Sequence, residues 1–79
     1  MTDDRERERL RWQCRRGMLE LDLILQKFIV REFDQLTERE CAVLKRLLNL
    51  PDDELLDYCY GRRSSDDSDV DALVRKITG

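Results

Sequence analysis

The hydrophobic positions of residues 19–33 follow a helical period and lie on almost every side of the expected helix. At 100° per residue, the polar side chains Glu20, Lys27, Arg31 and Asp34 share one narrow stripe. A helix that is apolar on this many sides is expected to be enclosed by its neighbours. The pattern therefore predicts a central helix surrounded by the rest of the chain, with Glu20 facing outward near its beginning.

Shorter helical patterns precede and follow this segment. A charged helix is expected at about residues 4–16, ended by Gly17 with a positive φ, and its Trp12 is expected to be half-buried. A third helix should begin at Thr37, because Thr37 and Glu40 have the spacing of a capping box.

The last third of the chain predicts two more helices. Pro51 should lie in the first turn of one, which Gly61 ends, and Ser68 should cap the other after a polar connector at about residues 62–67. The 79 residues thus form one domain, residues 1–79, and the fold class is all-α, a small five-helix bundle. The expected core comprises Leu21, Ile24, Leu25, Phe28, Leu44, Leu48 and Leu55.

The joint between the first two helices combines groups that folding does not require. Arg16, Gly17 and Glu20 would present a guanidinium, a backbone without a side chain and a carboxylate on one rigid turn. We expect these residues to bind a partner, with Arg15, Trp12 and Arg11 at the rim. These residues can also have purely structural roles. Arg15 and Arg16 would interact favourably with the negative end of the helix dipole, and a surface ion pair between Arg16 and Glu20 would contribute about 0–1 kcal/mol.

Charge and composition exclude several kinds of function. The net charge of −3 divides into +2 over residues 1–31 and −5 over residues 32–79, whereas nucleic-acid-binding domains are usually far more basic. The chain has no histidine to act as a general base, and its three cysteines are far apart. We therefore expect no enzymatic activity and no metal site, and Cys14 should be a buried small hydrophobic residue.

The sequence also supports an expectation about the cellular location of the protein. Its longest apolar run is too short to cross a membrane, and the arginine-rich beginning carries acids that transit peptides avoid. A bacterial cytoplasmic location is the simplest expectation, with a matured mitochondrial form as the alternative. Monomers or weak homodimers are expected in solution.

The joint carries a resemblance to a known family. The segment of residues 12–22 resembles the RGxxE segment of the small flavinylation factors of succinate dehydrogenase, and the similarity extends over about residues 9–60. Its matching residues are Trp12, Cys14, Arg15, Arg16, Gly17, Met18, Glu20, Leu21 and Asp22.

This resemblance implies an assembly factor that promotes covalent attachment of FAD to a histidine of the flavoprotein subunit of succinate dehydrogenase, with fumarate reductase served similarly. The partner would supply the histidine and the flavin, so no cofactor is expected to bind this chain stably. The alternative is a small nucleic-acid-binding or antitoxin-like regulatory module that uses the six arginines between residues 5 and 16.

Overall fold

The computed structural model describes residues 4–79, and it confirms the all-α fold. In chain order the elements are α1 (Asp4–Gln13), α2 (Leu19–Glu32), the short 3-10 helix η1 (Phe33–Gln35), α3 (Glu38–Leu48), α4 (Asp52–Cys59) and α5 (Ser68–Thr78). No strand occurs within the described residues. The five α-helices agree with the number expected from the hydrophobic pattern.

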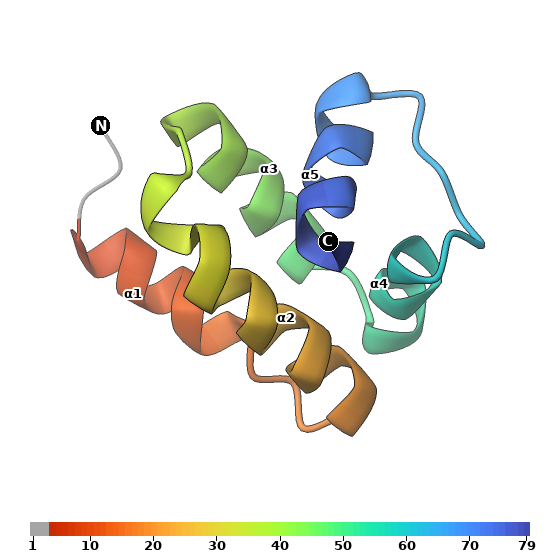
Figure 1. Ribbon diagram of the computed structural model, residues 1–79, viewed down its shortest axis with the longest axis horizontal. Helices are drawn as coiled ribbons and strands as arrows, with labels where there is room; N and C mark the ends of the chain where they lie inside the picture. The colour runs from red at the N-terminus through yellow and green to blue at the C-terminus, as the bar shows by residue number, and fades with distance from the viewer. Residues whose placement is uncertain (1–3) are drawn as a thin grey trace.

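The five helices of the described residues pack into one bundle (Figure 1). α1 and α2 run in roughly opposite directions and are joined by a turn of a few residues. α5 packs against α2, α3 and α4, while α1 also packs against α3. The polar connector expected at residues 62–67 forms the long loop between α4 and α5. This arrangement places the α1–α2 turn near the beginning of α4 and leaves one side of α2 uncovered.

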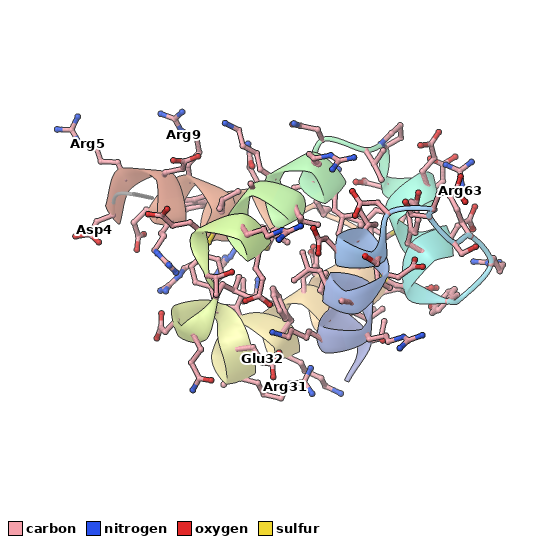
Figure 2. The ribbon with its side chains drawn as sticks, turned by 90° about the horizontal axis from the view of Figure 1, so that it is seen from above. Asp4, Arg5, Arg9, Arg31, Glu32 and Arg63 are labelled. Carbon is pink, nitrogen blue, oxygen red and sulfur yellow. The ribbon has the colours of Figure 1, made fainter. Side chains whose placement is uncertain are left out.

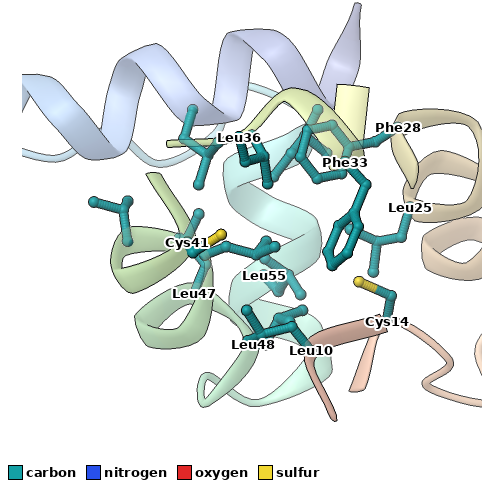
Figure 3. Packing of buried hydrophobic residues seen from close by; sticks show 14 of the residues in the cluster. Leu10, Cys14, Leu25, Phe28, Phe33, Leu36, Cys41, Leu47, Leu48 and Leu55 are labelled. Carbon is teal, nitrogen blue, oxygen red and sulfur yellow. The ribbon is translucent and has the colours of Figure 1, made fainter. Parts of the chain in front are cut away.

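All five helices contribute to one hydrophobic core (Figure 3). Cys14, at the end of α1, meets Leu25, Phe28 and Phe33 from the second helix and η1. Six of the seven expected core residues are buried: Leu21, Leu25, Phe28, Leu44, Leu48 and Leu55. The seventh, Ile24, is only partly buried and packs against the edge of the core.

The expectation that α2 would be enclosed on all sides is wrong. Leu19, Leu23 and Val30 are 73%, 55% and 85% exposed, and they follow one another along a single face of the helix. A chain this short has too few helices to cover every face of its central one. The result is a row of exposed apolar side chains that starts beside the α1–α2 turn.

Three predicted helix ends also differ. α1 ends at Gln13 rather than at residue 16, although Gly17 has the expected positive φ of 79°. Pro51 is the N-cap of α4 instead of lying in its first turn. Asp67, rather than Ser68, caps α5, because a carboxylate accepts a hydrogen bond from a backbone N–H more strongly than a hydroxyl does.

Two predicted signals at the helix ends are confirmed. The Thr37 hydroxyl accepts from the Glu40 N–H at 3.1 Å, and the Glu40 carboxylate accepts from the Thr37 N–H at 3.0 Å, which completes the capping box. Gly61 ends α4 with φ 75°, and the next N–H, of Arg62, bonds back to the Asp57 carbonyl.

Candidate functional site

The turn between α1 and α2, residues 14–18, is a fixed structure that we call the elbow. Its N–H groups at Cys14 and Arg15 still bond back to α1, after which the backbone leaves the helical path. The Arg16 N–H then donates to the Asp22 carboxylate at 2.7 Å, so α2 holds the elbow from its other side. Gly17 completes the reversal with its positive φ.

Gly17 lies at the exposed surface of the elbow. A Cβ added to Gly17 would meet no atom within 4 Å, so the protein's own packing does not require a glycine there. The positive φ does favour glycine, because an L-residue in this region is strained. The same absence of a side chain leaves the backbone open to close approach from outside.

The Arg16 side chain points into the molecule, and its ordinary pairing with Glu20 is not found. Its Nε donates to Asp52 Oδ1 at 2.7 Å, and its two terminal nitrogens donate to the carbonyls of Leu48 at 2.6 Å and Leu50 at 2.7 Å. These acceptors lie at the end of α3 and in the short turn to α4, where helical carbonyls lack partners. Only 15% of the side chain is exposed. Arg16 therefore fastens the elbow to the α3–α4 turn.

Glu20 is exposed in the first turn of α2, as the polar stripe predicted. Its Oε2 accepts a hydrogen bond from the Tyr60 hydroxyl, which comes from the end of α4, forty residues further along the chain. This hydrogen bond raises the pKa of Tyr60 above its ordinary value. Tyr60 is itself 51% exposed, so the two side chains form a pair at the surface.

The structure separates the three expected rim residues. Trp12 is 69% exposed rather than half-buried, and the Arg15 guanidinium lies 5.9 Å from the centre of its ring. Arg11 instead turns toward η1, where it lies 5.1 Å from the Phe33 ring centre and pairs with Asp34 at 3.4 Å. Trp12 and Arg15 are thus the accessible residues of the expected rim, whereas the Arg11 side chain is engaged by Phe33 and Asp34.

Trp12 also borders a surface groove between α1 and α2. The groove has a volume of about 380 Å³ and is lined by Glu8, Arg11, Trp12, Arg15, Gln26 and Ile29. It follows the same helix that carries the exposed Leu19 and Leu23. The elbow therefore lies in a part of the chain that also carries the exposed Trp12 on α1 and the Glu20–Tyr60 pair at the start of α2.

Sequence reasoning missed three residues that build this site. Asp22, Asp52 and Tyr60 hold the elbow backbone, the Arg16 guanidinium and the Glu20 carboxylate, respectively. Asp22 belongs to the matched segment and could have been suspected as a backbone acceptor. Asp52 and Tyr60 lie 36 and 40 residues from their partners, and no local spacing in the sequence connects them.

The cysteines do not form a reactive site. Burial raises the pKa of the Cys14 thiol to about 11, against the smaller opposing effect of Arg16. Burial also raises the pKa of Cys41 and of Cys59, and all three thiols are free. Thiols with raised pKa values are poor nucleophiles near neutral pH, and Cys14 is a buried small hydrophobic residue as expected. Within residues 4–79, no group of three or more metal-ligating side chains comes together.

Some of the six arginines between residues 5 and 16 make hydrogen bonds within the protein, and others point into solvent. Arg7 donates to the carbonyls of Leu36 at 2.9 Å and Phe33 at 3.3 Å, so it shares with Arg16 the role of holding helix ends. Arg5 and Arg9 point away from the bundle (Figure 2). A phosphate backbone would thus meet fewer of the six arginines than the sequence suggested.

None of the helices within residues 4–79 is long and apolar enough to cross a membrane.

Comparison with known proteins gives a consistent result. The model of a family described as the flavinator of succinate dehydrogenase matches residues 8–79. A protein named FAD assembly factor SdhE from Coxiella burnetii is 38% identical over 77 residues, which cover 98% of this chain and 94% of that protein. A protein of the same name from Legionella pneumophila (strain Lens) is 52% identical over 59 residues, 75% of each chain. The family model and the Coxiella burnetii match both include the elbow, and the latter spans nearly the whole chain.

Proposed function

The chain belongs to the family of flavinators of succinate dehydrogenase, and from this we propose that it promotes covalent attachment of FAD to the flavoprotein subunit of that enzyme. The elbow surface, made of Trp12, Arg15, Gly17 and Glu20, would be the part that contacts the partner. Family membership supports the general role of an assembly factor. The assignment of the surface rests on the geometry of the elbow.

One observation carries this assignment: Gly17, on the elbow, and Glu20, in the first turn of α2 directly after it, are both exposed, and the rest of the protein holds the elbow in place. The turn is fastened by Asp22 through the backbone and by Asp52 through Arg16. A surface whose shape is fixed before binding loses little conformational freedom when the partner arrives. The elbow is therefore suited to impose a conformation on a larger protein.

The structure also suggests how the work is divided between the two proteins. Within residues 4–79 the thiols are buried or have raised pKa values, and the chain has no histidine. In this proposal, the partner supplies the histidine and the flavin, while the small protein aligns them by binding. Alignment of reacting groups can account for a large share of a rate enhancement. The chain would then be no enzyme by itself and hold no FAD stably.

Arg16 takes a different role from the one suggested by the motif. Because its guanidinium is directed at α3 and α4, it positions the elbow rather than meeting the partner directly. Arg11, engaged with Phe33 and Asp34, lies at the edge of the proposed surface. The partner would then contact the Glu20 carboxylate, the exposed backbone of Gly17, and the side chains of Trp12 and Arg15.

The direct test measures flavin attachment to purified, FAD-free flavoprotein subunit of succinate dehydrogenase, with and without this protein, by in-gel flavin fluorescence. We expect the wild-type protein to accelerate attachment and Glu20→Ala to reduce it, while that change alters the free energy of unfolding by no more than about 0.5 kcal/mol. Asp34→Ala is the matched control, because Asp34 is an exposed carboxylate at the far end of the same stripe.

Two results would overturn the proposal at different levels. If wild-type protein leaves the rate of flavin attachment unchanged, the proposed function fails. If Glu20→Ala is as active as Asp34→Ala, the function stands but the elbow is not the docking surface. The same assay with the flavoprotein subunit of fumarate reductase tests whether both enzymes are served, and titration with free FAD tests whether the cofactor binds this chain.

A further inference from the structure

Tyr60 is an exposed aromatic residue whose position is fixed by the end of α4. The Schellman arrangement around Gly61 ends the helix directly after it, with the Arg62 N–H bonded to the Asp57 carbonyl at 2.9 Å. The Arg62 guanidinium lies 5.0 Å from the centre of the Tyr60 ring. The Tyr60 hydroxyl thus contacts the Glu20 carboxylate and its ring contacts an arginine, yet half of the side chain's surface remains accessible.

The position of this tyrosine matters because Glu20 has no other hydrogen bond from a side chain in the described residues. One carboxylate oxygen accepts from the Tyr60 hydroxyl, which restricts the rotamers of an otherwise exposed and flexible side chain. The second oxygen accepts no hydrogen bond from a side chain of residues 4–79, and it can accept one from an external donor. A carboxylate held in this way fits one cationic or N–H group at a defined place.

We propose that Tyr60 is part of the partner-binding surface, where its hydroxyl orients Glu20 toward a basic or N–H group of the partner and its ring extends the contact to the end of α4. This inference rests on the proposed function and deepens it by adding a positioning residue from outside the matched elbow. Tyr60 acts through Glu20, and its exposed ring adds apolar area of the kind enriched in binding surfaces.

The test is a double-mutant cycle on the affinity for the FAD-free flavoprotein subunit. Tyr60→Phe retains the ring and removes only the hydroxyl, and Glu20→Gln retains the shape and removes the charge. We expect Tyr60→Phe to weaken binding by about two- to tenfold, the range for one lost hydrogen bond. Because the tyrosine acts through the carboxylate, the double variant should bind no more weakly than Glu20→Gln alone.

Tyr58→Phe is the matched control for this change. Tyr58 lies two residues earlier, in the last turn of α4, is partly buried against the core, and its hydroxyl makes no hydrogen bond within residues 4–79. Its substitution should leave the affinity unchanged. Circular dichroism of all variants at the assay temperature establishes that each is folded.

A second measurement examines the pair without any partner. The hydrogen bond to Glu20 raises the pKa of Tyr60, so the absorbance titration of the phenol near 295 nm should contain a tyrosine that ionises late. Glu20→Gln should move this ionisation to lower pH, and Tyr60→Phe should remove it from the titration. A titration that Glu20→Gln does not change would show that the pair does not form in solution.

The possible results separate this inference from the proposed function. If the wild-type protein does not bind the subunit, the proposed function fails. If the wild type binds, Glu20→Gln weakens binding and Tyr60→Phe equals the wild type, only the role of Tyr60 is overturned. If the two losses multiply in the double variant, Tyr60 contacts the partner independently, and the positioning role is refuted.

Discussion

Arg16→Ala should destabilise the protein far more than an ordinary surface substitution. The change removes three short hydrogen bonds, to the carbonyls of Leu48 and Leu50 and to the Asp52 carboxylate. It also releases the elbow from the turn between α3 and α4. A partner-binding arginine in solvent would have none of these contacts.

The magnitude follows from the burial of each acceptor. Hydrogen bonds to a charged group contribute about 1.5–3 kcal/mol each when they are protected from water, and their sum is less than additive. Asp52 is about one-third exposed, so its ion pair is counted at roughly 0–1 kcal/mol. We therefore expect a loss of about 2–4 kcal/mol from a total stability that is on the order of 4–12 kcal/mol for a chain of this length.

Urea denaturation followed by far-UV circular dichroism measures this loss, because almost all the regular structure is helical. Arg15→Ala is the matched control, since the neighbouring arginine is exposed and should change the free energy of unfolding by less than about 0.5 kcal/mol. Arg16→Lys should be intermediate, because a single ammonium cannot reach all three acceptors. Equal stabilities of Arg16→Ala and Arg15→Ala would refute the internal role of Arg16.

Three further predictions concern stability and use the same denaturation assay. Leu25→Ala should cost about 2–4 kcal/mol, whereas Leu23→Ala, on the exposed face, should cost less than about 1 kcal/mol, and similar losses would contradict the described core. Gly17→Ala should cost about 1–2 kcal/mol through backbone strain alone, because its Cβ meets no atom; a neutral change would show that φ is not positive. The pKa of Glu40 lies below its ordinary value of 4.5, chiefly through the Lys76 hydrogen bond, so its contribution should be present above pH 4.5 and decrease as the pH falls further. Glu40→Gln should flatten this acid dependence, measured as the melting temperature from pH 6 to pH 3.

Much of the fold could be predicted because helix formation depends on short-range patterns. The capping box at Thr37 and the positive φ of Gly17 and Gly61 each follow from residues within a few positions. The burial of α2 could not be predicted in the same way. The helical periodicity shows which faces of α2 are apolar. It does not show how many neighbouring helices are available to cover Leu23 and Val30, which are exposed.

In the site, too, the features that depend on neighbouring residues could be predicted, whereas contacts between residues far apart in the sequence could not. The exposure of Glu20 follows from its place on the polar stripe of α2, and the free backbone of Gly17 follows from its turn. The acceptors of Arg16 could not be inferred, because Leu48, Leu50 and Asp52 reach it only when the chain is folded. A motif identifies which residues matter together, whereas it does not separate the residues that build a surface from those that contact a partner.

That separation changes how loss of function in this motif should be interpreted. Arg16 points inward to α3 and α4, while Gly17 and Glu20, one and four residues later, face outward. In the proposed function, a variant at Arg16 fails in flavin attachment because the elbow has lost the contacts that hold its position. In the same proposal, a variant at Glu20 that fails while its fold is intact has lost a contact with the partner. Because the two effects differ in stability by about 2–4 kcal/mol, unfolding measurements on the same samples distinguish them without a structure of the complex.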